Sequence, residues 1–122
     1  MKANELRIGN YVIANKDEVI VAGFVGFYVS YIPIEKYHAY ADMIHHIKPI
    51  PLTEEWLLKL GFEQCFINKE RYHIDNLNEV EFIDNEIRWM ANYTTFYHQK
   101  IEFVHQLQNL YFALTNTELK TT

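Results

Sequence analysis

The sequence is poor in cysteine and in long apolar runs, and each of these absences excludes a class of protein. Cys65 is the only cysteine in 122 residues, so neither an intramolecular disulfide nor a cysteine-rich zinc site can form. No stretch approaches the roughly 20 apolar residues of a membrane span. Residues 1–6 also lack the apolar run of a signal peptide. We therefore expect a cytoplasmic protein that does not enter the membrane.

Positive charge and catalytic motifs are also scarce. The chain has 11 Lys and Arg against 16 Asp and Glu, a net charge of -5, which argues against affinity gained by coating nucleic-acid phosphates. It contains no Gly-rich phosphate loop, no G-x-S-x-G motif and no recognisable Ser/His/Asp arrangement. We expect no enzymatic activity and no cofactor.

What is present is enough to fold. Apolar residues make up 49% of the chain and aromatic residues 16%, which is typical of a packed interior. Short apolar stretches at residues 11–14, 19–24 and 27–32, separated by turns near Asn15 and Gly26, predict strands. Residues 44–47 suggest another strand, and residues 35–43 can hold one helical turn. This pattern favours a small SH3-like barrel, with a plain antiparallel sheet as the alternative.

A proline-containing connector, residues 49–52, precedes the best-defined helix signal. Thr53 can cap a helix whose buried stripe includes Trp56, Leu57 and Leu60, and Gly61 can end it. Strands are expected again at residues 71–74, 79–82, 87–90 and 94–103. Residues 65–67 read as a strand with the Cys65 thiol buried and inert.

The chain closes with an amphipathic helix over residues 104–114, followed by Asn116 at a position that tolerates positive φ. The predicted fold is one α+β domain over residues 1–122. Residues 1–48 form the SH3-like strand lobe, and residues 53–122 form the capped helix, a second antiparallel sheet and the closing helix.

Aromatic and amide side chains are the candidate binding residues. Rings on a small barrel can grip a peptide or stack on bases, or they can pack inside with their hydroxyls at the rim. The polar face of the last helix is either simply exposed or recognises a partner. The predicted partner-binding residues are Tyr28, Tyr31, Tyr37, Tyr40, Gln106 and Asn109, with Gln108 beside the two amides.

Histidines and glutamates are weaker candidates for a metal site or for acid–base chemistry. Six histidines are scattered without metal-ligand spacing: His38, His45, His46, His73, His98 and His105. We expect them to be partly exposed or hydrogen-bonded, with His45 and His46 on opposite faces of a strand. Glu79, Glu81 and Glu86 form an acidic strip that we expect to be solvated.

Three segments together resemble a known family. They are LRIGN at residues 6–10, PIPLTEEWLLKLGF at residues 49–62 and VHQLQNLYFALT at residues 104–115. The family consists of small uncharacterised proteins encoded by bacteriophages and by integrated mobile elements of gut bacteria. The resemblance implies a phage or mobile-element origin, and it carries no catalytic residue to this chain. Asn116 stands where the family would have glycine.

These observations predict a non-enzymatic accessory or interaction protein of a mobile element, whose partner is another protein. The alternative is a nucleic-acid-binding module that uses the tyrosines with Arg7, Lys36 and Lys48. A small hydrolase or metalloenzyme is a third hypothesis, motivated only by the histidines and glutamates.

Overall fold

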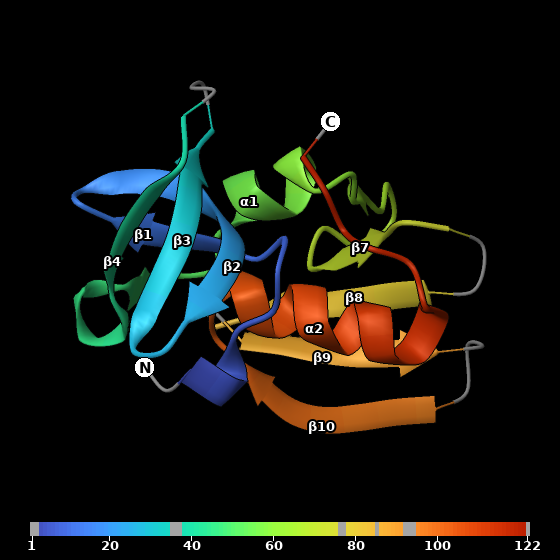
Figure 1. The fold of residues 1–122 in the computed structure, drawn as a ribbon. Helices are drawn as coiled ribbons and strands as arrows, with labels where there is room; N and C mark the ends of the chain where they lie inside the picture. The colour runs from blue at the N-terminus through green and yellow to red at the C-terminus, as the bar shows by residue number, and fades with distance from the viewer. Residues whose placement is uncertain (1–2, 35–37, 76–77, 85, 92–94, 122) are drawn as a thin grey trace. The chain divides into compact units, whose positions relative to one another are not determined.

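The fold is α+β, with two antiparallel sheets and two α-helices in the part of the chain that the structure describes (Figure 1). The structure, a computed structural model, describes residues 3–34, 38–75, 78–84, 86–91 and 95–121. The chain divides into two compact units. The first comprises Met1–Pro51 and Phe103–Glu118, and the second comprises Leu52–Glu102 and Leu119–Thr122.

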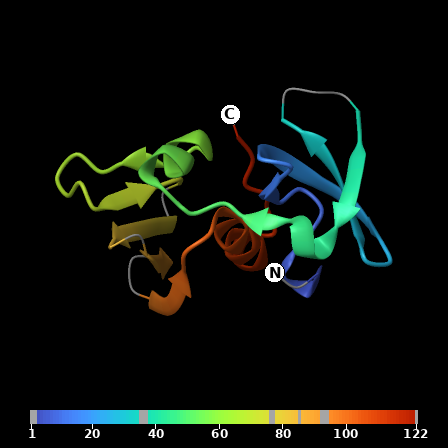
Figure 2. The same ribbon diagram turned by 90° about the vertical axis from the view of Figure 1, so that its left-hand side faces the viewer.

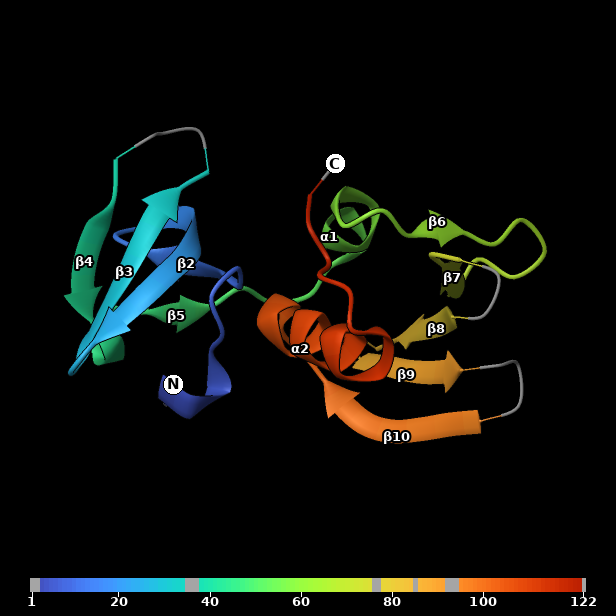
Figure 3. The same ribbon diagram turned by 45° about the vertical axis from the view of Figure 1, so that its right-hand side comes forward.

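Short apolar stretches joined by tight turns build the sheet of the first unit (Figure 3). Its strands lie in the order β4-β3-β2-β1-β5 and pair antiparallel. They are β1 (Tyr11–Ala14), β2 (Asp17–Val25), β3 (Tyr28–Pro33), β4 (Tyr40–Met43) and β5 (Lys48–Pro49). The register shifts between Val21 and Gly23, as at a bulge. Val12, Val19, Val21 and Val29 form the core together with Leu6 and Ile47.

The segment after β3 differs from the sequence prediction. Residues 40–43, where one helical turn was an option, form β4 because they pair with β3. Residues 44–47 were expected to be a strand, and this is wrong: Ile44–His46 is a 3₁₀ helix. The Ile44 amide donates to the Phe27 carbonyl at 2.8 Å, which fixes the start of this turn by a contact distant in sequence.

The C-terminal helix α2 (Val104–Thr115) belongs to the first unit and lies beside the N-terminal segment (Figure 2). Val104, Leu107 and Tyr111 are buried at the predicted helical spacing. Asn116 ends the helix at φ 57°, and its amide donates to the Phe112 carbonyl. The sequence prediction of this helix and of its stop is confirmed.

The second unit starts with α1 (Glu54–Lys59), which is capped as predicted. Thr53 Oγ1 accepts a hydrogen bond from the Trp56 amide at 3.2 Å. At the other end Gly61 has φ 96°, and the Phe62 amide donates to the Leu57 carbonyl. This bond and the one from Gly61 to Leu58 form the glycine-stopped helix end expected from the sequence.

The second sheet has the order β10-β9-β8-β7-β6, all antiparallel. Its strands are β6 (Glu63–Gln64), β7 (Arg71–His73), β8 (Asn78–Ile83), β9 (Glu86–Ala91) and β10 (Thr95–Ile101). Tyr72, Val80 and Trp89 are cross-strand neighbours and are all buried, so they form one inward row. The Trp89 ring meets that of Phe62 edge to face at 6.4 Å.

The expected strand at residues 65–67 is wrong. β6 ends at Gln64, Cys65 is half-buried, and Phe66 and Ile67 are 97% and 93% exposed. Instead of pairing, this segment forms the loop between β6 and β7. The Cys65 amide, which donates to the Arg71 carbonyl at 2.7 Å, is its last link to the sheet.

The unit boundary coincides with the proline connector, but α2 groups with the first sheet. The sequence division had placed it with residues 53–122. Side-chain hydrogen bonds from α2 to the segment of residues 5–11 join the helix to this unit. No helix in the described ranges is long and apolar enough to cross a membrane.

Candidate functional site

The predicted tyrosine cluster is divided between two faces of the first sheet. Tyr28 is the cross-strand partner of Met43, and Tyr31 is the partner of Tyr40. Because side chains alternate along a strand, Tyr28 lies on one face while Tyr31 lies on the other. Tyr28 is 52% exposed and Tyr31 only 7%. Tyr37 lies outside the described residues.

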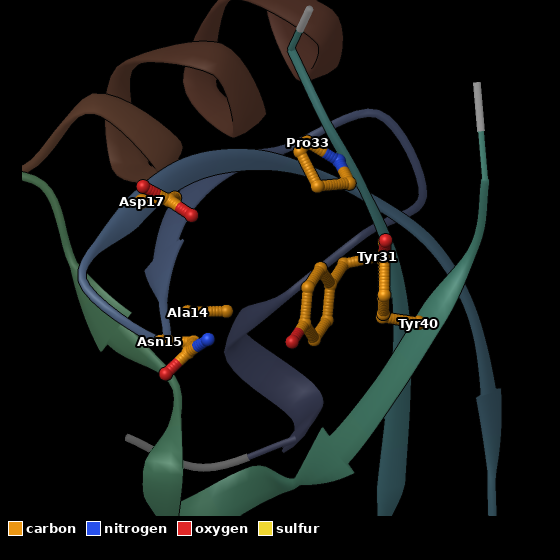
Figure 4. Close-up of a pocket in the computed structure, with 6 residues that line it drawn as sticks. All are labelled: Ala14, Asn15, Asp17, Tyr31, Pro33 and Tyr40. Carbon is orange, nitrogen blue, oxygen red and sulfur yellow. The ribbon is translucent and has the colours of Figure 1, made fainter. Parts of the chain in front are cut away.

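Tyr31 and Tyr40 line a small hollow of about 200 Å³ (Figure 4). Their rings stack with centroids 6.1 Å apart and planes 22° apart. In Figure 4 the Tyr31 hydroxyl points toward the side where Asn15 lies, and Asp17 lies across the hollow from Tyr40. The remaining lining residues are Ala14 and Pro33. The β1–β2 turn therefore supplies polar groups to a hollow whose far wall is aromatic.

The electrostatics of this hollow are acidic. Burial, and then the carboxylates of Asp42 and Asp17, raise the pKa of the Tyr31 phenol above its ordinary value, so the hydroxyl stays protonated. Asp42 itself is held by His46, whose Nδ1 lies 2.6 Å from Oδ1, and this hydrogen bond lowers the pKa of the carboxyl. The side chain of Asp17, in contrast, makes no hydrogen bond or ion pair with a described residue, although its backbone pairs with Ala14.

Sequence reasoning missed an exposed apolar surface at the tip of the β2–β3 hairpin. Residues 25 and 28 are joined by a two-residue turn with Gly26 at φ 58°, as a type II′ turn requires. The hairpin patch consists of Phe24, Val25, Phe27 and Tyr28, with Met43 on β4, at exposures of 39%, 75%, 79%, 52% and 36%. The available signal was the absence of any polar residue from 19 to 29, because a hairpin this apolar cannot bury both faces.

Two amide residues of α2, Gln108 and Asn109, hold the N-terminal segment. Gln108 is fully buried, accepting from the Tyr11 amide at 2.8 Å and donating to the Gly9 carbonyl at 3.0 Å. Asn109 donates to the Glu5 carbonyl and accepts from Asn10 Nδ2 at 2.9 Å. The interpretation of an exposed amide face is therefore wrong for Gln108. Gln106 accepts from the Phe103 amide and so caps its own helix.

Arg7 is part of the same network. Its guanidinium donates to Asn109 Oδ1 at 2.8 Å, pairs with Glu118 and lies 4.1 Å from the centre of the Phe112 ring. Of the cations invoked for nucleic-acid binding, Arg7 is thus engaged inside the fold. Lys48 is exposed on β5, and Lys36 lies outside the described residues.

The histidines do not converge. No group of three or more His, Cys, Asp or Glu within the described ranges is placed to hold a metal ion. His45 and His46 were expected on opposite faces of a strand; this is wrong, because they lie in the 3₁₀ helix with ring centroids 4.2 Å apart. His38 is exposed, and His73 lies 3.5 Å from Glu63. The side chain of His98 lies outside the described part of the chain.

His105 is the exception, because it is buried. It is 2% exposed, and neither ring nitrogen has a hydrogen-bond partner among the residues described. Burial lowers the pKa of its imidazole, and the Glu5 carboxylate opposes this only partly. The ring stacks at 6.0 Å on Phe103 and is neutral in the folded protein near pH 7. It is a buried residue of the core.

The acidic strip is less exposed than its alternation predicted. Glu79, Glu81 and Glu86 are all half-buried. The side chain of Glu81 is 15% exposed, because Arg71 on the neighbouring strand pairs with it at 3.2 Å. This pair is a cross-strand contact of the sheet.

Fold and surface together define an α+β protein of two antiparallel sheets, with a polar hollow and an apolar hairpin tip on its first unit. Comparison with models of protein families, with curated proteins and with solved structures found no match to this chain.

Proposed function

We propose that this chain is a non-enzymatic interaction protein that binds another protein through the hairpin patch. The observation that carries the proposal is the exposure of Val25, Phe27 and Tyr28 together at one hairpin tip. Val25 and Tyr28 are cross-strand partners, and Tyr28 is in turn the partner of Met43, so three of the five patch residues form one row on the outer face. Contiguous exposed apolar surface of this kind marks interaction sites, and aromatic residues dominate their binding energy.

Charge favours a protein partner over a membrane or a nucleic acid. The segment from 19 to 34 contains no lysine or arginine, so the hairpin offers nothing to lipid or nucleic-acid phosphates. The overall charge of -5 acts in the same direction. An apolar patch on an acidic protein is better matched by an apolar protein surface with a basic or neutral rim.

We also propose an SH3-like assignment for the first sheet, a cytoplasmic location and an origin in a phage or mobile element. The SH3-like assignment is supported by the return of β5 to pair with β1 and by the irregularity in the long strand β2. The location and the origin rest on the sequence alone.

The test is capture of the partner with matched phenylalanine variants. Phe27→Ser and Phe66→Ser make the same change at two highly exposed positions in different units. We expect the wild type and Phe66→Ser to recover the same amount of bound protein. Phe27→Ser should recover at least about tenfold less. Equal recovery by Phe27→Ser, or retention of anionic vesicles or nucleic acid in place of a protein, would overturn the proposal.

A further inference from the structure

The hollow beside the β1–β2 turn is lined by polar side chains. The Asp17 carboxylate, the Asn15 amide and the Tyr31 hydroxyl all line it. None of the three makes a side-chain hydrogen bond or ion pair with another described residue, although they surround the same space (Figure 4). Asn15 and Asp17 are exposed at the β1–β2 turn, whereas Tyr31 is only 7% exposed and is held by packing.

The size of the hollow limits what it can take. Pockets that enclose a whole small molecule measure about 300–1,000 Å³. A volume of about 200 Å³, open on one side, suits the end of a single side chain. None of the six lining residues is basic, and the one charge among them is negative.

We propose that this hollow binds a cationic side chain, the ammonium of a lysine or the guanidinium of an arginine, presented by a partner protein. Such a group carries only donors, so the Asp17 carboxylate and the Tyr31 hydroxyl oxygen, which both line the hollow, can accept from it. The aromatic wall formed by Tyr31 and Tyr40 favours the same occupant, because aromatic rings attract a nearby cation.

Burial, and after it the Asp42 and Asp17 carboxylates, raise the pKa of the Tyr31 phenol. Asp42 is already paired with His46, which leaves Asp17 as the carboxylate available to a ligand. The inference goes beyond the proposed function, because Tyr31 and Tyr40 lie on the face of the sheet opposite to Tyr28. Either site can fail without the other.

The test is titration of the ¹⁵N-labelled full chain with blocked amino acids, followed by NMR. N-acetyl-lysine amide and N-acetyl-arginine amide are the probes, and the norleucine and citrulline amides are their uncharged counterparts. The charged probes should shift amide resonances of Asn15, Asp17, Tyr31 and Tyr40. The uncharged probes should bind at least about tenfold more weakly, because a hydrogen bond to a charged group is worth more than a neutral one. Added salt should weaken binding of the charged probes.

Two pairs of variants separate the charge from the ring. Asp17→Asn should weaken binding about tenfold, whereas Glu18→Gln, the same charge change at the next residue and outside the lining, should not. Tyr40→Leu should weaken binding about threefold, and Tyr40→Phe, which keeps the ring face, should retain it. Unchanged resonances elsewhere in each variant would show that the fold is intact.

Three outcomes would overturn the proposal. The first is equal binding of lysine and norleucine amides, which would make the hollow an apolar pocket. The second is equal loss in Asp17→Asn and Glu18→Gln, which would reduce the effect to net charge. The third is the absence of any shift at the four lining residues up to tens of millimolar probe, well above what one charged side chain should need.

Discussion

Lys16 occupies the second position of the β1–β2 turn with φ 68°, after Asn15 at φ 50°. A two-residue turn of this type requires positive φ at both positions, which asparagine tolerates well and lysine does not. The side chain of Lys16 is exposed, so no packing compensates for the strain. Lys16, which lies next to the hollow, is therefore in a strained backbone conformation, and glycine at this position would relieve the strain.

We expect Lys16→Gly to raise the free energy of unfolding by about 0.5–1 kcal/mol, the relief of strain exceeding the extra entropy of glycine in the unfolded chain. Urea unfolding measures it. Lys48→Gly is the matched control: it lies in a strand at ordinary φ and should destabilise. Equal effects of the two variants would show that the turn is not strained.

The buried imidazole of His105 predicts that the free energy of unfolding depends on pH. Its pKa is lowered by burial, so between the ordinary value and the folded value the unfolded chain binds a proton that the folded chain does not. Stability from this residue is complete above about pH 6.5 and falls as the pH drops below it, by at most about 1.4 kcal/mol per pH unit.

Urea unfolding of the wild type and of His105→Leu at several pH values from 5 to 8 tests this. The variant should be at least as stable at pH 7, because it buries no unpaired nitrogen, and its curve should be flatter below pH 6.5. His38→Gln, an exposed histidine, should keep the wild-type slope. Parallel curves for the wild type and His105→Leu would contradict the assignment.

At the scale of elements, the sequence predicted helix ends correctly where the conformation depends on neighbouring residues. The Thr53 cap, the Gly61 stop and the Asn116 stop each involve residues within one turn, and all three were predicted. Residues 44–46 and 65–67 were assigned wrongly because their conformation depends on strands far away in the sequence. The hollow was equally hidden, since it needs the register that places Tyr31 opposite Tyr40.

The burial of Gln108 illustrates the same limit, because a glutamine on an amphipathic helix reads as a surface residue. Its amide bonds the Tyr11 amide and the Gly9 carbonyl, so it ties α2 to the segment that leads into β1. We therefore interpret two of the segments that carry the family resemblance, residues 6–10 and 104–115, as parts of one structural network.

We expect Gln108→Met to lower the free energy of unfolding by about 2–4 kcal/mol, because two buried backbone groups lose their partners. Gln106→Met is the control. It loses the half-buried bond to the Phe103 amide at 3.2 Å and should cost less than about 1 kcal/mol. Urea unfolding gives both values, and hydrogen exchange at the Tyr11 amide should accelerate only in the first variant. Similar costs for both would mean that the network contributes little.

At the scale of the whole molecule, the first unit is discontinuous in sequence. It is assembled from Met1–Pro51 and Phe103–Glu118, with the second unit inserted between them. The two ends of the insertion point are close: Pro51 and Phe103 form an isolated β-bridge, and the Val104 amide donates to the Ile50 carbonyl at 2.9 Å. A short linker can therefore replace residues 52–102 without moving either end.

We expect a chain in which a few glycines and serines join Pro51 to Phe103 and residues 119–122 are removed to fold as a monomer. Its ¹⁵N–¹H spectrum should be dispersed, with β1 and α2 protected from exchange, because every hydrogen bond of the Arg7 and Gln108 network lies inside it. Residues 1–51 alone should remain unfolded. They lack the amides that bond Gly9, Asn10 and Tyr11, so buried polar groups would be left without partners. A folded 1–51 fragment, or an unfolded linked chain, would show that α2 does not complete this unit.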